Sequence, residues 1–157
     1  MTLAVFDCVV LLQAAANPFG PAGACLAFVE SGDVKLFLSA AILEEARDVF
    51  LRPATRKRFP KLTEEDVDRF LLKVATLSTF VHDVPVTPQL SRDPNDEMYL
   101  HLALAAQAPF IVSRDKDLLD LLKDDTFRKA YPTLAIIDPP SFLTHVRNEI
   151  AQKTSNE

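Results

Sequence analysis

The residues of this chain that could do chemistry are carboxylates that follow short apolar segments. Asp7 comes directly after the apolar run 3–6, Asp115 comes shortly after the run 109–112, and Asp117 follows two residues later. If both runs are parallel strands of one sheet, their carboxyl ends share an edge, and ligands bind at that edge in open sheets. Carboxylates gathered there repel each other, and a divalent cation removes that penalty. Oxygen-only ligands suit Mg²⁺ or Mn²⁺.

A further acid lies on the border of a predicted helix face. In the helix expected over residues 40–51, Ile42 and Val49 belong to the apolar face. At about 100° per residue Glu45 falls beside them, whereas Glu44 points nearly opposite. A carboxylate at the edge of the core costs free energy unless a partner compensates it. Glu45 is therefore the better candidate of the two.

The helix that begins near Asp96 is apolar almost all round. Asp96 shares the stripe of Leu100 and Ala103, which places a carboxylate near the core side of this helix. Together with Asp7 and Asp115, it completes a set of acids that could converge on one edge of the sheet.

Each acid also has a purely structural explanation. Asp7 could cap the helix that follows it, Asp96 could act as a capping-box acid after Asp93, and Asp115 could be an acid of a first helical turn. Glu45 could be a rim residue of its helix. Taken singly, these explanations compete well with a catalytic one, and convergence of the acids is what favours a metal site.

Strand-forming and helix-forming segments alternate along the chain. Thr63 and Asp66 have the spacing of a capping box, and Ser39 is a natural N-cap. Strands are predicted at 3–6, 34–38, 80–84, 109–112 and 134–137, and helices at 8–16, 22–31, 40–51, 63–78, from 93, at 113–123 and from 140. This alternation predicts an α/β fold with a parallel sheet covered by helices on both faces.

Length and composition favour a single intracellular domain. The chain has 157 residues, which we divide into one domain over 1–150 and a polar, frayed tail over 151–157. Cys8 and Cys25, the only cysteines, are expected to be buried thiols. The apolar beginning lacks an early Lys or Arg and is interrupted by Asp7, so we expect the cytoplasm and no membrane association.

The charge balance restricts how the chain could hold a polyanion. The net charge is −5, so attraction of nucleic acid requires a local basic patch or a bound cation. The densest basic stretch consists of Arg52, Arg56, Lys57, Arg58 and Lys61, in a turn predicted over 52–61. A solvated turn and a contact with RNA are both open readings of this stretch.

Four blocks of the sequence resemble the PIN-domain family, specifically the VapC-like toxins of toxin–antitoxin pairs. The resemblance runs from about Leu3 to Phe142 and gains its specificity from the order and spacing of the blocks. The blocks are Val5-Phe6-Asp7-Cys8-Val9-Val10-Leu11, Ser39-Ala40-Ala41-Ile42-Leu43-Glu44-Glu45 with Val49-Phe50-Leu51-Arg52-Pro53, Arg92-Asp93-Pro94-Asn95-Asp96, and Ile111-Val112-Ser113-Arg114-Asp115-Lys116-Asp117-Leu118-Leu119.

The resemblance implies a three-layer α/β/α sandwich with a central, mostly parallel five-stranded sheet. It also implies a Mg²⁺- or Mn²⁺-dependent endoribonuclease that cleaves single-stranded RNA, with a cognate antitoxin protein as partner and a homodimer as assembly. The family's acids would fall on Asp7, Glu45, Asp96, Asp115 and the accessory Asp117. Asp7, Asp96 and Asp115 would hold the metal.

The resemblance also assigns a supporting role. Ser113 matches the small hydroxyl residue that the family commonly carries before its fourth acid. The charge pattern, and not the resemblance, makes Arg52, Arg56, Lys57 and Arg58 the candidate RNA contacts.

The chain departs from the family at one position. Members usually carry Asn two residues after the first aspartate, and this chain has Val9, which cannot hydrogen-bond. The alternative to a ribonuclease is therefore a weakened or inactive PIN-like domain that binds RNA or a protein without cutting.

Other enzyme classes that use acids at a sheet edge fit less well. Phosphatases of the haloacid dehalogenase type need Asp-x-Asp after the first strand, and Asp7-Cys8-Val9 lacks the second acid. Response-regulator receivers need an acid after the third strand, where this chain has Pro85-Val86-Thr87-Pro88. Cleavage of DNA by a related nuclease is a weaker alternative, because such enzymes usually have more chain and more acids.

Overall fold

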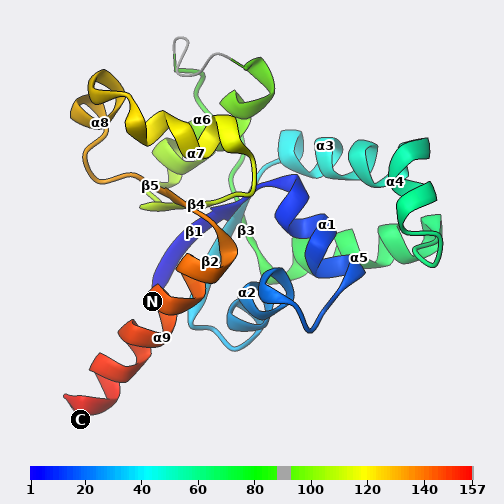
Figure 1. Cartoon of the computed structure of the whole chain (residues 1–157), viewed down its shortest axis with the longest axis horizontal. Helices are drawn as coiled ribbons and strands as arrows, with labels where there is room; N and C mark the ends of the chain where they lie inside the picture. The colour runs from blue at the N-terminus through cyan, green and yellow to red at the C-terminus, as the bar shows by residue number, and fades with distance from the viewer. Residues whose placement is uncertain (88–92, 157) are drawn as a thin grey trace.

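Figure 1 shows the computed structural model, which describes residues 1–87 and 93–156. Its centre is a five-stranded, all-parallel sheet with the strand order β3-β2-β1-β4-β5. The strands are β1 (Thr2–Phe6), β2 (Val34–Leu38), β3 (Thr79–Phe80), β4 (Phe110–Val112) and β5 (Ala135–Ile137). The predicted α/β fold with a parallel sheet is confirmed.

The order of the strands reverses at β1. The chain proceeds from β1 through β2 to β3 on one side, and then places β4 and β5 on the other side of β1. Crevices at such a reversal, beyond the carboxyl ends of the strands, are where ligands bind in open α/β sheets. The ends of β1 and β4 therefore lie side by side at the position that favours a functional site.

Helices cover both faces of the sheet (Figure 1). One face carries α6, which contacts β1, β2 and β4, together with α7 and α8, while α2 packs against β2 and α9 on the opposite side. The helices are α1 (Cys8–Ala16), α2 (Pro21–Glu30), α3 (Ala40–Leu51), α4 (Pro53–Arg58), α5 (Glu64–Leu77), α6 (Glu97–Ala106), α7 (Lys116–Asp120), α8 (Asp125–Ala130) and α9 (Pro139–Ser155), with 3₁₀ turns η1 (Pro94–Asp96) and η2 (Leu121–Lys123).

Apolar burial explains why these segments fold as they do. β1 contributes Ala4, Val5 and Phe6 to the core, all at most 2% exposed, because a central parallel strand is covered on both faces. α6 buries Tyr99, Leu100, Leu102 and Ala103, in agreement with its nearly uniform apolar surface. α6 is therefore held against β1, β2 and β4 by its buried apolar side chains.

Side chains at the ends of strands cap the helices that follow. Asp7 caps α1, Ser39 caps α3 as predicted, Asp115 caps α7 and Asp138 caps α9. Each side chain satisfies a backbone N–H that the first helical turn leaves free. Two of the candidate catalytic acids are therefore also structural caps.

Two predicted elements after α3 differ from the structure. The stretch 52–61, predicted as a turn, contains the helix α4, which begins with Pro53 at a position where its missing N–H costs nothing. The strand predicted over 80–84 is limited to Thr79–Phe80, and Asp83 adopts a left-handed backbone with φ of 51° that ends the extended segment.

The last third of the chain also differs from the prediction. The helix expected over 113–123 is α7 followed by η2, and α8 was not predicted; it forms because Asp124 caps it and Phe127 is buried. α9 continues to Ser155, so most of the segment expected as a frayed tail is exposed helix.

No single helix in the described part of the chain is long and apolar enough to cross a membrane. α1 and α2 reach the required length and hydropathy only when taken together, and they are bent by 96° at the break between them.

Candidate active site

The junction of β1 and β4 places the first and fourth acidic blocks next to each other. Phe6 pairs with Val112 in the parallel ladder, and the Asp7 N–H donates to the Val112 carbonyl at 3.0 Å. Asp7 is 2% exposed. The sheet register itself therefore brings Asp7 beside Ser113, the residue that follows β4.

The hydroxyl of Ser113 links two of the predicted acids. Ser113 is fully buried, donates its hydroxyl proton to Oδ2 of Asp7, and accepts the Asp115 N–H at 2.9 Å. A hydroxyl can donate and accept at the same time, which an apolar side chain of similar size cannot do. This geometry fits the supporting role expected for Ser113.

Asp7 is held on both carboxylate oxygens. Its Oδ1 accepts the Val10 N–H at 2.9 Å, as an N-cap does. Burial raises the pKa of Asp7, and the hydrogen bonds from Ser113 and Val10 oppose that rise, while the charge of Asp115 adds to it. The site therefore keeps a carboxyl group in a place where its charged form is disfavoured.

Asp115 is the N-cap of α7, and Asp117 lies in the first turn of this helix. Asp115 caps this helix by accepting the Asp117 N–H at 2.8 Å, and the Asp117 side chain is exposed. Asp115 therefore has a structural role as an N-cap, one position before the first turn in which it was expected, and it also lies next to Asp7 and Ser113.

Asp96 is a second buried acid of the group with a raised pKa. It is 4% exposed, and its Oδ2 has no hydrogen-bond partner among the described residues. Burial is the main cause that raises the pKa of Asp96 to about 7, and the negative charges of Asp115, Asp93, Asp117 and Asp7 contribute to this rise. The structure therefore brings Asp7, Asp96, Asp115 and Asp117 within electrostatic reach of one another.

Glu45 stands slightly apart from these four acids. Its side chain is 26% exposed and lies 3.6 Å from the guanidinium of Arg52, whereas Glu44 is exposed, as the helical projection predicted. Burial raises the pKa of Cys8 to about 11, and the charges of Glu45 and Arg52 also act on this thiol. Glu45 thus faces the start of α1, but it is not among the main influences on the pKa of Asp7 or Asp96.

Tyr99 is a residue of the site that the sequence reasoning missed. It is 4% exposed, and its hydroxyl oxygen accepts the N–H of Cys8, the first residue of α1, at 3.1 Å. Tyr99 follows Asp96 by three residues, which is nearly one helical turn. Its hydroxyl therefore ties the helix that follows Asp96 to the helix that Asp7 caps. A tyrosine within an apolar helix, which needs a partner when buried, was the available signal.

Val9 does not disturb the arrangement of Asp7. Its side chain is 37% exposed on α1, and both oxygens of Asp7 find their partners in Ser113 and Val10. The position of Asp7 therefore does not depend on a polar side chain at residue 9.

The candidate RNA contacts lie on and beside α4. Arg56, Lys57 and Arg58 are exposed and form no ion pair with any described residue, whereas Arg52 pairs with Glu45 and with Asp48. Arg92, the first residue of the third acidic block, lies outside the described residues.

The acids do not form a ready-made metal cage. Over residues 1–87 and 93–156, no group of three or more His, Cys, Asp or Glu side chains is arranged as a set of metal ligands. Carboxylate oxygens are nevertheless the donors that hard divalent cations prefer. The buried, unpartnered Oδ2 of Asp96 is an acceptor that a cation would satisfy.

Comparison with known families settles what kind of domain this is. A family model described as the PIN domain matches residues 4–117, which include the five candidate acids. The chain belongs to the PIN-domain family. PIN domains are in general nucleases.

A solved structure supports the fold of this PIN domain. A chain of VapBC2 from Rickettsia felis, crystallised with a DNA fragment from their promoter, superposes with a TM-score of 0.52. The match covers 87% of this chain and 98% of the other at 12% identity, which shows a shared fold. No curated protein matches the sequence.

The raised pKa of Asp96 predicts how stability depends on pH in the absence of metal. A carboxyl group whose pKa is higher in the folded than in the unfolded state stabilises the fold below about pH 4, and this contribution is lost as the pH rises through about 7. We expect the EDTA-treated protein to have a higher Tm at pH 5 than at pH 7.5.

In the same measurement, Asp96→Asn should reduce the difference in Tm between the two pH values, and the raised pKa of Asp7 should account for part of what remains. Asp48→Asn, on the exposed side of α3, is the matched control and should keep the full difference. A Tm that rises between pH 5 and pH 7.5 would contradict the burial of Asp96 described above.

The contact of Tyr99 predicts a stability cost for Tyr99→Phe. This substitution keeps the ring and leaves the buried Cys8 N–H without its acceptor, which should lower the free energy of unfolding by about 1–3 kcal/mol. The control is Tyr131→Phe, because the Tyr131 hydroxyl makes no hydrogen bond among the described residues. Equal urea-unfolding curves for the two variants would show that the Tyr99 contact does not stabilise the fold.

Proposed function

We propose that the protein is a metal-dependent endoribonuclease that cleaves single-stranded RNA as the toxin of a toxin–antitoxin pair. The observation that carries this proposal is the placement of Asp7, Asp96 and Asp115 at the strand-order reversal of a PIN domain. The mutual repulsion of these acids, together with the unpartnered Oδ2 of Asp96, favours a cation as the missing component.

The residues fit a hard divalent cation in donor chemistry. Asp7, Asp96 and Asp115 would hold Mg²⁺ or Mn²⁺ through carboxylate oxygens, with Glu45 and Asp117 completing the acidic surroundings. When bound, such an ion neutralises charge on a phosphate and lowers the pKa of water.

The chain's own residues prepare the site for a phosphodiester. Ser113 holds one oxygen of Asp7 and the backbone N–H of Asp115, so the two acids keep a fixed relative position. Asp117 is exposed and Glu45 is partly exposed, so either side chain could accept a proton from an attacking water. No covalent nucleophile is needed, because water attacks phosphorus directly in this reaction class.

The exposed cations of α4 could attract RNA to a chain whose net charge is negative. Arg56, Lys57 and Arg58 are not neutralised by any described acid, and Arg52 links them to Glu45. In a chain of net charge −5 such a local patch would steer RNA toward an acidic site.

The partners of the proposed toxin are an antitoxin protein and a second copy of the chain. Support for the antitoxin comes from the fold shared with a VapBC2 chain, and the homodimer rests on the family resemblance.

A non-catalytic PIN domain that binds RNA or protein is the second candidate. Two observations favour it: Val9 stands where relatives usually carry Asn, and no three-ligand group is preformed among the described residues.

Cleavage of a fluorogenic single-stranded RNA in Mn²⁺ decides between the two candidates. We expect cleavage that EDTA abolishes and that Asp115→Asn lowers by about 100-fold or more, because a charge that acts on the transition state is lost. Asp7→Asn should have the same effect, whereas Asp68→Asn, on the exposed side of α5, should be neutral.

Each variant needs a matched unfolding curve, because Asp7 and Asp115 also cap helices. Full activity in folded Asp7→Asn or Asp115→Asn would refute the assignment, and an inactive wild type would favour the binding module.

A further inference from the structure

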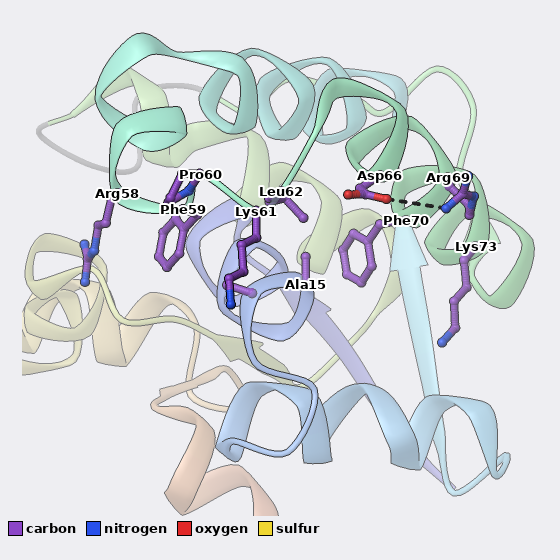
Figure 2. A pocket seen from close by; sticks show the side chains of 11 residues that line it. Ala15, Arg58, Phe59, Pro60, Lys61, Leu62, Asp66, Arg69, Phe70 and Lys73 are labelled. Carbon is purple, nitrogen blue, oxygen red and sulfur yellow. Dashed lines mark hydrogen bonds and ion pairs between the residues drawn. The ribbon is translucent and has the colours of Figure 1, made fainter.

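A second cleft lies away from the carboxylates, between the end of α1, the connection from α4 to α5, and α5 itself (Figure 2). Its volume is about 660 Å³, which is within the range of pockets that bind small ligands or parts of larger ones. We call it the basic-aromatic cleft. Its lining residues that matter here are Ala15, Arg58, Phe59, Lys61, Leu62 and Phe70.

The apolar part of the cleft is built around two aromatic rings. In Figure 2, Phe59 and Phe70 lie at separate positions along the cleft, with Ala15 and Leu62 between them. Phe70 stacks on Phe50 of the core, with ring centroids 6.1 Å apart, and this contact holds the Phe70 ring in place. The guanidinium of Arg58 lies over the ring of Phe59, 5.2 Å from its centroid.

Of the four cations that line the cleft, Arg69 pairs with Glu65 and Asp66, Lys73 pairs with Glu30, and the other two are uncompensated. Residues 52–61 include five cations and no acid, and Arg58 and Lys61 form no ion pair with a described residue. Asp66 is the acid of the lining, and its carboxylate is already occupied by the Thr63 N–H and by Arg69. The cleft therefore offers free positive charge beside an apolar, aromatic surface.

The cleft is connected to the candidate active site by one helix. α1 begins directly after Asp7 and ends at Ala16, which lines the cleft. Its nine residues span about 13 Å. On the neighbouring side, the cations run from Arg52, which pairs with Glu45, through α4 to Lys61. An extended polyanion could therefore contact both places at once.

We propose that the basic-aromatic cleft binds a nucleobase of single-stranded RNA, a few nucleotides away from the phosphate held at the carboxylates. Phe59 stacks on the base, and Arg58 and Lys61 bind the flanking phosphates. Proteins that bind single strands combine aromatic side chains for base stacking with cations that follow the backbone. The choice of RNA as the ligand rests on the proposed ribonuclease function, because the cations from Lys61 to Arg52 lead to Glu45 beside the acidic site.

The test measures RNA binding without cleavage. A fluorescein-labelled 12-nucleotide RNA is titrated with the full chain in EDTA, and its anisotropy is compared with that of an equally long oligomer that lacks bases at its central positions. Phe59→Leu keeps an apolar side chain and removes the aromatic face. Lys61→Gln removes one exposed cation, and Lys129→Gln on α8 is its matched control.

We expect Phe59→Leu to weaken binding of the normal RNA about tenfold, in the lower part of the range for one stacked base, and to leave the abasic oligomer nearly unchanged. Lys61→Gln should weaken both oligomers and reduce the salt dependence of binding by about one phosphate contact. Lys129→Gln should bind like the wild type. Because Lys61 is exposed, its variant tests the cleft even if Phe59→Leu is poorly folded.

Other outcomes would overturn the assignment. Wild-type affinity in both cleft variants would show that RNA does not use the cleft, and equal loss of both oligomers in Phe59→Leu would exclude base stacking. A 12-residue amphipathic acidic peptide that binds the wild type but not Phe59→Leu, while RNA affinity is unchanged, would assign the cleft to a peptide partner.

Binding in EDTA and cleavage in Mn²⁺ together distinguish a wrong nuclease assignment from a wrong subsite assignment. If RNA binds through Phe59 and Lys61 in EDTA but is not cut in Mn²⁺, the subsite stands and the nuclease assignment fails. If RNA is cut normally by both variants with unchanged KM, the nuclease stands and the subsite fails.

Discussion

Repulsion among buried carboxylates is the constraint on which the candidate site depends. Asp96 is 4% exposed and Asp7 2% exposed, and both lie within reach of the charge of Asp115. Such a group of acids does not persist in a fold unless the scaffold or a ligand compensates it. The pKa values of Asp7 and Asp96 are raised first by burial and then by the neighbouring negative charges.

The scaffold holds these acids through contacts that each perform two tasks. Asp7 and Asp115 are helix caps, so the same carboxylates that repel one another also stabilise the starts of α1 and α7. Ser113 connects them through one buried hydroxyl, and Tyr99 anchors α1 to the helix that follows Asp96. The acids are therefore positioned by buried contacts, while the cations of α4 stay exposed and free to meet a polyanion.

The sequence was most informative where chemistry followed from position along a strand or helix. Asp7 and Asp115 could be identified because parallel strands end at a common edge, and Glu45 was separated from Glu44 by its helical face. The contact of Tyr99 with Cys8 and the unpartnered oxygen of Asp96 could not be predicted, because both depend on where α6 packs over β1. The short helices α4 and α8 were missed because caps and prolines, not apolar periodicity, define them.

The most direct test of this account is a calorimetric titration of Mn²⁺ into the metal-free protein near pH 7. Performed in two buffers of different ionisation enthalpy, it reports both binding and the protons released. Because burial and neighbouring charges raise the pKa of Asp96 to about 7, the account predicts Mn²⁺ binding with release of a proton, and loss of that release in Asp96→Asn. Absence of Mn²⁺ binding, or binding with a proton release that Asp96→Asn leaves unchanged, would contradict it.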